Sequence, residues 1–179
     1  MLYASDVVEK DGKYYLYAYL VDALGCVLTG GCFITERNLF ERPVTFITDG
    51  CVMGYKYFEF GDDYSSKIMK FVAKVRGLGA KSRIRILIDD PTNGEEIGTC
   101  EIGTGDGIYE GIVNKVTGRH SVYLVAEHGY DSMDFAMPGF ETRHLFELDT
   151  FVLLKQFEAV IVTLSFMPHA SWCSFSFHL

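Results

Sequence analysis

Apolar and polar positions alternate along much of the chain between residues 52 and 154, which predicts a series of short β-strands. The run SRIRILI at 82–88 shows this period clearly, and Gly- and Asp-rich turns separate it from its neighbours. Strands at intervals near ten residues, without a long amphipathic helical pattern, favour an all-β antiparallel sandwich or barrel. The predicted strands are 52–60, 67–76, 82–89, 95–102, 108–117, 119–127 and 145–154.

Residues 67–76 are open to a helical interpretation. Their β-branched and aromatic content, and the glycine at 77 that ends them, favour a strand instead.

An N-terminal β-hairpin is predicted from Asp11-Gly12, which lies between two β-rich runs. This dipeptide tolerates the positive φ angles of a type I′ turn, and a two-residue loop would pair Lys10 with Lys13 and Val8 with Tyr15. One hairpin alone is marginally stable in water, so we expect it to pack on something, and we hypothesise that it pairs along an exposed sheet edge.

Charge and composition limit the classes of partner. The 179 residues carry a net charge of −8 and are 49% hydrophobic, which excludes disorder and leaves no basic cluster for nucleic acid. The last 21 residues, after Glu158, have no charged side chain, but they include Pro168, His169 and four serines and make a poor membrane span. No basic segment followed by an apolar one opens the chain, so no secretory signal is expected in it, and localisation stays open.

The C-terminal segment 156–179 has two interpretations. It is either an apolar tail that covers a sheet edge or a segment unrelated to the preceding domain. We therefore divide the chain into a hairpin with a junction over 1–43, a β-sandwich over 44–155 and an apolar C-terminal tail over 156–179.

The five cysteines and five histidines show no metal-site spacing. The cysteines are odd in number, scattered and without a CxxC pair, which favours buried thiols over a zinc site or a disulfide framework. His120 lies at a predicted strand start, and His128 and His144 flank a loop. We expect each of these histidines to be a surface or loop residue and not a ligand.

No sequence motif of a common enzyme class is present, and the glycine-rich stretch 103–107 lies between two strands, where it predicts a turn. Adjacent acidic residues such as Asp62-Asp63 fit solvated turns, so no catalytic residue is assigned. A binding function has more support, because sugar sites need aromatic rings and planar polar side chains on loops of a rigid scaffold. The loop 127–144 carries three aromatic residues, including Tyr130, and Tyr109 follows the glycine-rich turn. These rings either contact a ligand or pin the loop to the core.

Four segments resemble a family 6 carbohydrate-binding module. DGCVMGYKYFEFGDDYSSKIMKFVAKVRGLG is similar to its early strands, and SRIRILIDDPTNGEEIGTCEI to its IxIRLDSPTGxxIGTxxV pattern. TGRHSVYLVAE and LFELDTFVL follow in the same order as SGxHDLYLVF and LFNLDWFxF, so that the likeness covers about 110 of the 179 residues. The resemblance implies a jelly-roll β-sandwich over about 44–155 that binds xylan, cellulose or other β-glycans.

The N-terminal segment resembles a different family. YASDVVEKDGKYYLYAYLVD, within about 1–27, is similar to a blade hairpin of glycoside hydrolase family 43, whose propellers carry APDV and GKYYLYY. A five-bladed propeller needs far more chain than 43 residues, and Asp6, in the APD-like position, is not assignable as its base. The resemblance therefore implies part of a hydrolase, without catalysis by this chain alone.

The family 6 resemblance also implies site residues. The family's stacking Trp falls at Ile108, with Tyr109 adjacent, and its recognition Asn falls at Glu147. We expect Tyr109, Tyr130 and Glu147 to bind the sugar. Asp149 matches the Asp that helps to bind a structural calcium ion in the family, so it is the candidate metal ligand, although no EAE-type motif precedes Asp49 and one carboxylate is a poor calcium site.

The sequence thus predicts an antiparallel jelly-roll β-sandwich with an N-terminal β-hairpin that binds an oligo- or polysaccharide of plant β-glycan, xylan or arabinan type. Two alternatives stay open. One is a xylosidase- or arabinofuranosidase-like activity in a homo-oligomer, and the other is a structural domain that self-associates without a ligand.

Overall fold

The computed structural model describes residues 26–38, 41–62, 68–129 and 143–155, together with strands at 7–10 and 13–16. All regular structure in these ranges is β-strand, and no helix in them could cross a bilayer. The strands are β1 (Val7–Lys10), β2 (Lys13–Leu16), β3 (Val27–Thr29), β4 (Phe33–Ile34), β5 (Val44–Ile47), β6 (Val52–Glu59), β7 (Ile68–Gly77), β8 (Ser82–Ile88), β9 (Glu95–Ile102), β10 (Gly107–Asn114), β11 (Arg119–His128) and β12 (Phe146–Lys155).

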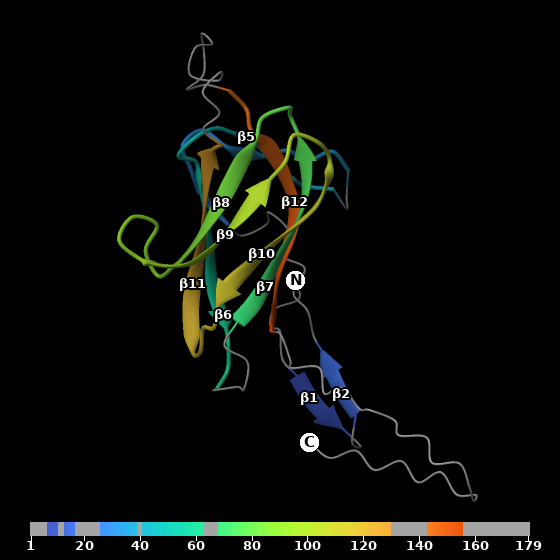
Figure 1. Cartoon of the computed structure of the whole chain (residues 1–179), viewed down its shortest axis with the longest axis vertical. Helices are drawn as coiled ribbons and strands as arrows, with labels where there is room; N and C mark the ends of the chain where they lie inside the picture. Colours follow the sequence, from blue (N-terminus) through green and yellow to red (C-terminus); the bar gives the residue numbers. More distant parts are fainter. Residues whose placement is uncertain are drawn as a thin grey trace, which may run out of the picture.

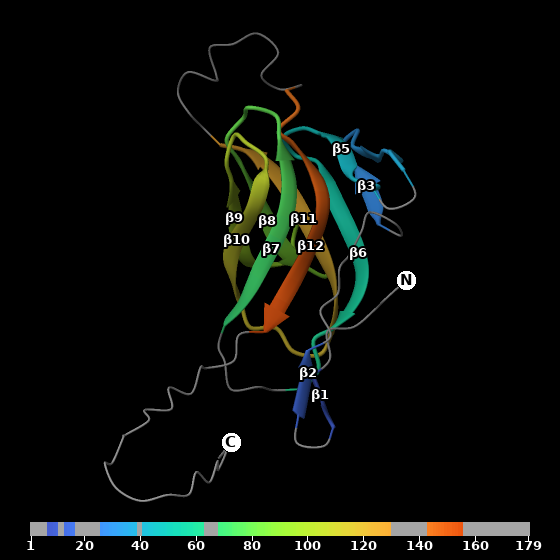
Figure 2. The same cartoon turned by 90° about the vertical axis from the view of Figure 1, so that its right-hand side faces the viewer.

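Ten of these strands form one antiparallel sheet in the order β3-β6-β11-β8-β9-β10-β7-β12-β5-β4. It folds over between β9 and β10, whose one recorded pairing joins Gly98 to Val113, so that two layers of strands face each other (Figures 1 and 2). Its two end strands, β3 and β4, are separated in sequence only by residues 30–32, so the sheet nearly closes on itself. The protein is an antiparallel jelly-roll β-sandwich, as the sequence predicts.

The predicted hairpin forms with the expected register. β1 and β2 pair through Val8 with Tyr15 and Lys10 with Lys13. In the described part of the chain these two strands pair only with each other, so the hypothesis that they extend the sandwich edge is wrong. The edge positions are occupied instead by β3 and β4, which lie in the segment that the sequence analysis treated as a junction. The sandwich therefore includes residues before 44, and its last strand ends at Lys155.

The core lies between the two layers, because each strand directs alternate side chains inward. β7 buries Phe71 and Ala73 and exposes Lys74 and Arg76, so the strand interpretation of 67–76 is confirmed. Phe151 of β12 lies at the centre of an aromatic cluster, with its ring centroid 4.9 Å from that of Tyr55 and 5.5 Å from that of Phe71. This rigid interior fixes which side chains of β7, β10 and β12 reach the outer surface.

Candidate functional site

A surface depression of about 410 Å³ lies over the outward faces of β10, β7 and β12. Strand alternation places Lys74 and Arg76 of β7 there, and Ile108 of β10 is 68% exposed beside them. The segment between β4 and β5 adds Arg37 and Glu41. This volume lies within the range typical of small-ligand sites. The remaining lining residues are Pro43, Val75, Asp106, Gly107, Glu147 and Asp149.

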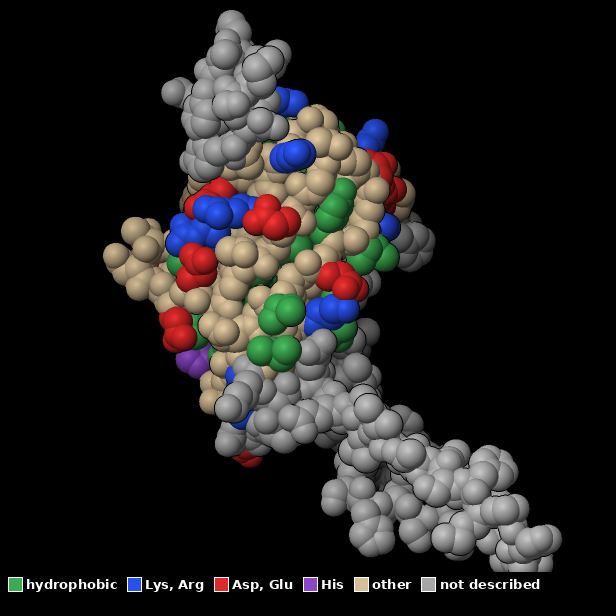
Figure 3. Space-filling model, in the orientation of Figure 1, with side chains coloured by type: hydrophobic (Ala, Val, Ile, Leu, Met, Phe, Trp, Pro, Cys, Tyr) green, Lys and Arg blue, Asp and Glu red, His purple; other side chains and the backbone are tan. Residues whose placement is uncertain are grey.

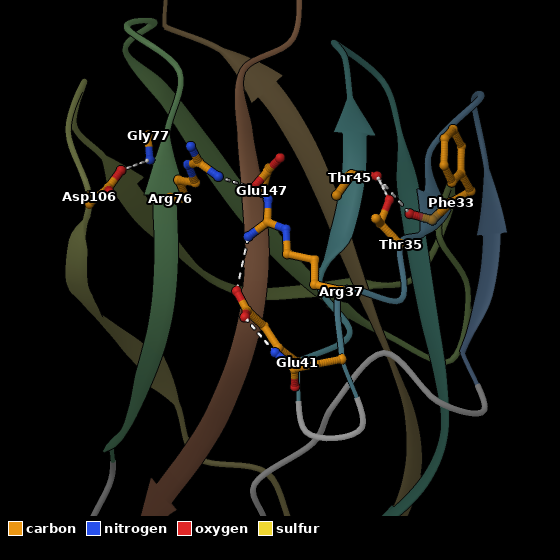
Figure 4. A network of polar contacts seen from close by, with 10 residues as sticks. Phe33, Thr35, Arg37, Glu41, Thr45, Arg76, Gly77, Asp106 and Glu147 are labelled. Carbon is orange, nitrogen blue, oxygen red and sulfur yellow. Dashed lines mark hydrogen bonds and ion pairs between the residues drawn. The ribbon is translucent and has the colours of Figure 1, made fainter.

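Glu147 is the centre of the polar network in this depression (Figure 4). Its carboxylate accepts a hydrogen bond from Arg37 and lies 3.8 Å from the guanidinium of Arg76. Arg37 also donates to Glu41 at 3.0 Å, and its pKa is raised by the hydrogen bonds to Glu41 and Glu147. The Glu147 side chain is only 15% exposed, so the two arginines hold it in a fixed orientation.

Asp149 lies on the same strand and pairs with Lys74 at 2.5 Å, which raises the pKa of that lysine. The described residues contain no group of three or more His, Cys, Asp or Glu side chains that could hold a metal ion. An ammonium group bonded to the one candidate carboxylate does not fit a calcium site, which needs six to eight oxygen ligands. The candidate calcium ligand therefore has no supporting partners among the described residues.

An exposed pair of aromatic rings lies on the neighbouring strands β4 and β5. Phe33 and Phe46 are 47% and 45% exposed, and their rings stack with centroids 4.5 Å apart and an interplanar angle of 21°. His144 contacts Phe46 edge to face at 4.7 Å. We call Phe33, Phe46 and His144 the aromatic platform. Large exposed apolar side chains that stack on each other outside the core are typical of a binding surface.

A β-bulge brings Phe46 to the surface. β12 pairs Phe146 with Ile47 and Leu148 with Val44, so that Thr45 and Phe46 together lie opposite the single residue Glu147. Phe46 has a φ of 58°, which a bulky L-residue adopts at a cost in free energy. The bulge therefore places the platform beside the Glu147 network, and strain of this kind concentrates at functional sites.

Buried hydroxyl groups hold the platform in place. The Thr45 side chain is 3% exposed, and its hydroxyl lies 2.6 Å from that of Thr35 and 3.3 Å from the carbonyl oxygen of Phe33 (Figure 4). On the face in Figure 3, acidic and basic side chains lie next to one another and do not gather into patches of one sign. The site thus combines apolar rings with neutralised charge pairs.

The sequence-predicted sugar ligands lie in different places. Glu147 lines the depression, but Tyr109 is not among its lining residues, because neighbouring residues of β10 face opposite sides. The Tyr109 ring packs partly against the core, and its hydroxyl donates to the Gly105 carbonyl oxygen at 2.6 Å. Tyr130 lies outside the described residues. Sugar binding by Tyr109 and Tyr130 stays a prediction.

One of the histidine expectations is wrong. His128 is 1% exposed at the end of β11, where its Nδ1 lies 2.8 Å from the Gly129 carbonyl oxygen and its backbone N–H donates to Asp49 at 2.7 Å. Its position beside a loop suggested a surface residue, but the strand continues through it into the core. The four cysteines in the described ranges are free thiols, as expected, and three of them are buried.

Phe33, Phe46 and Arg37 were not predicted as site residues from the sequence. Phe33 and Arg37 lie in the assumed junction, and nothing in the letters PVTFIT shows that a bulge turns Phe46 outward. The one usable signal was an aromatic residue three positions before the DGCVMGY segment on which the family resemblance depends.

The comparisons with known proteins bear on the fold. No family model and no curated protein sequence matches the chain. Among solved structures, a family 6 carbohydrate-binding module from Clostridium cellulolyticum in complex with xylose is similar, with 27% identity, a TM-score of 0.60, and coverage of 76% of this chain and 97% of that one. The protein has a family 6-like carbohydrate-binding-module fold.

Other similar structures agree with this family 6-like fold. A module from Clostridium stercorarium in complex with cellobiose is 18% identical, with a TM-score of 0.59 and coverage of 77% of this chain and 94% of that one. A glycoside hydrolase family 43 arabinoxylan arabinofuranohydrolase from Bacillus subtilis is 19% identical, with a TM-score of 0.56. The match to this enzyme covers 77% of the present chain but only 27% of the enzyme.

Proposed function

We propose that the protein binds an oligo- or polysaccharide of plant β-glycan, xylan or arabinan type at the aromatic platform and the adjoining depression. The observation that carries the proposal is the exposed, stacked Phe33–Phe46 pair beside the fixed carboxylate of Glu147. Similar structures of this fold hold xylose and cellobiose, as their names state, which supports a sugar as the ligand class.

The chemistry of the site suits a sugar. Pyranose and furanose rings present C–H faces, which pack on exposed aromatic rings and remove apolar surface from water. Their hydroxyl groups both donate and accept hydrogen bonds, so they can bond to a carboxylate and to guanidinium N–H groups side by side. Glu147 supplies the acceptor, and Arg37 and Arg76 supply the donors.

The cation–carboxylate pairs at this site favour binding over hydrolysis. Glu41, Glu147 and Asp149 each pair with a cation, and Asp106 accepts a hydrogen bond from the backbone N–H of Gly77 at 3.0 Å. Glycoside hydrolysis needs two carboxyl groups that flank one bond, one of them ready to give up a proton. Four carboxylates already engaged in structural contacts are poorly suited to form such a pair.

Calorimetric titration tests the proposal. We expect wild-type protein to release heat with xylo-, cello- or arabino-oligosaccharides. Phe46→Ala should lower the association constant by about tenfold or more, because a stacking ring is lost. Ile112→Ala, at a 66% exposed residue of β10 outside the lining of the depression, is the matched control and should leave affinity unchanged. Absence of heat with all three sugar classes would exclude the proposed function.

A Tyr109→Ala variant belongs in the same series, because the sequence assigns Tyr109 to the sugar. The platform site predicts a smaller effect there than at Phe46, since the Tyr109 hydroxyl is bonded to its own turn. A larger loss of affinity in Tyr109→Ala than in Phe46→Ala would indicate that the sugar binds at the end of the sandwich where β9 turns into β10.

A further inference from the structure

Two buried thiols meet where the sheet nearly closes. Cys32 lies in the turn between β3 and β4, after Gly30 and Gly31, and Cys51 directly precedes β6. Cys32 is 6% exposed and Cys51 is fully buried. The two thiols therefore lie on segments 19 positions apart that pack against each other at the edge of the sandwich.

The contacts place the two thiols on neighbouring peptide groups of one turn. Cys51 Sγ donates to the carbonyl oxygen of Gly30 at 3.0 Å, and Cys32 Sγ to that of Thr29 at 3.5 Å, so the two thiols bond to consecutive peptide groups. The neighbouring Cys51 side chain also contributes to the raised pKa of Cys32, as expected for two thiols that lie near each other. At Gly30, whose φ is 87°, a Cβ atom would lie 2.9 Å from Cys51 Cα, so the turn touches the Cys51 backbone.

We propose that Cys32 and Cys51 form a disulfide when the protein meets a low-molecular-weight disulfide as oxidant, and that this bond closes the segment carrying the two phenylalanines of the aromatic platform. A protein thiolate attacks the small disulfide and releases one small thiol, and the second protein thiolate then displaces the other. Two S–H bonds are lost and one protein S–S bond forms, while the small disulfide takes up both electrons and both protons as two thiols.

The bond would tie together the ends of residues 33–50. This closed segment contains Phe33, Arg37, Glu41 and Phe46, which are the platform rings and the loop residues of the depression. A covalent link across about 20 residues lowers the entropy of the unfolded chain, and it restricts motion of the binding segment in the folded one. The effect on sugar affinity rests on the proposed function, whereas formation of the bond does not.

Burial makes the reduced pair slow to react. Desolvation and the neighbouring Cys51 raise the pKa of Cys32 to about 12, so little thiolate is present near neutral pH. We therefore expect the disulfide to form quickly during refolding, when the thiols are accessible, and slowly in the folded protein.

The test uses the full chain, refolded with either reduced glutathione alone or a mixture of reduced and oxidised glutathione. After alkylation of free thiols, peptide mass mapping should find a Cys32–Cys51 crosslink only in the oxidised sample. An unchanged set of free thiols after oxidative refolding overturns the proposal. So does a dominant bond to Cys26, Cys100 or Cys173, or a stable mixed disulfide with glutathione.

Thermal unfolding gives the second readout. Oxidation should raise the melting temperature by roughly 6–12 °C, and this gain should vanish in Cys32→Ser and Cys51→Ser. Cys26→Ser removes the half-buried third thiol nearby, and Cys100→Ser removes a buried thiol of β9, so both serve as controls that should keep the gain. A gain that survives in Cys32→Ser contradicts the assignment.

Sugar titration tests the effect on sugar affinity separately from formation of the disulfide. Oxidised protein should bind the oligosaccharide about two- to tenfold more tightly than reduced protein, because the platform segment is pre-organised. If the crosslink and the thermal gain are present but no sugar binds, the disulfide holds and the proposed function fails. If sugar binds equally in both states, the link to affinity is wrong.

Discussion

Two networks on the outer surface share one chemistry and differ in how the chain builds them. In the first, Glu127 of β11 lies between Arg83 and Arg85 of β8, at 2.6 Å and 3.1 Å, and Arg85 continues to Glu96 of β9. In the second, Glu147 of β12 lies between Arg37 and Arg76. Both glutamates are shielded, with 20% and 15% of their side chains exposed.

The two networks differ in the part of the chain that supplies the second arginine. Arg83 and Arg85 are two positions apart on one strand, so strand periodicity alone places them on the same face. Arg37 comes from the segment between β4 and β5 and reaches Glu147 across 110 positions of sequence. The first network, which we call the ladder, joins strands of one layer, and β8 and β9 shift register between Ile86 and Leu87 beside it. The second network also includes a segment outside the strands, and it lines a depression. Similar ion pairs thus line a recess only where a segment outside the strands joins them.

The largest predicted difference between the networks is in sugar affinity. Glu147→Gln should weaken binding by about tenfold, because the amide no longer pairs with two arginines and its orientation is lost. Glu127→Gln should leave affinity unchanged. Titration of both variants with the same oligosaccharide measures the difference, and equal losses would show that the depression is not the site.

The second prediction concerns strain at the bulge. Phe46→Ala and Phe46→Gly remove the same ring and should lose sugar affinity equally. Glycine tolerates a φ of 58° better than alanine, so the glycine variant should be more stable by about 1 kcal/mol in urea unfolding. The ladder has no residue of this kind. Equal stability of the two variants would show that the bulge relaxes when the ring is removed.

The third prediction concerns the contribution of the ladder to stability. Glu127→Gln should lower the free energy of unfolding by up to about 1 kcal/mol, because Arg83 and Arg85 lose their common partner while water screens the loss. Glu59→Gln, at an exposed position of β6, is the control and should change little. Denaturant unfolding at low and at 1 M salt measures both. A loss that grows with salt would contradict an electrostatic origin.

The smallest effect on stability is expected from the His120–Asp89 pair, which belongs to neither network. His120 Nδ1 lies 2.7 Å from Asp89, and this hydrogen bond raises the pKa of the imidazole. The pair therefore stabilises the fold fully below the ordinary histidine value near 6.5, and this contribution is lost as pH rises through the higher folded value.

Between about pH 6 and pH 8.5, the stability advantage of wild type over His120→Gln should fall by less than about 1 kcal/mol. Urea unfolding of both proteins across this range measures the advantage. One that grows with pH would contradict the direction of the pKa shift.

The same contrast explains what the sequence could predict. The strands that build the ladder, β8, β9 and β11, were predicted to within one residue, because alternation is a local property. The hairpin register at Asp11-Gly12 was also correct, because a two-residue turn leaves one pairing. Glu147 was found through the resemblance, which aligned it with a known recognition position.

What could not be predicted depends on tertiary packing. β3 and β4 have three and two residues, too few to show a period, and only their pairing with β6 and β5 makes them strands. The exposure of Phe46 follows from a bulge whose partner lies on β12, a hundred residues later. His128 is buried because the strand runs one residue further than the pattern suggested.

The shortness of the two end strands affects how the protein associates with itself at high protein concentration. A long free strand would offer a row of unpaired N–H and C=O groups to another polypeptide, which is a common route to fibrils. Here the ten-stranded sheet ends in strands of three and two residues that follow each other along the chain. These two strands themselves offer few backbone groups to a neighbouring molecule, which limits edge-to-edge joining of copies through them.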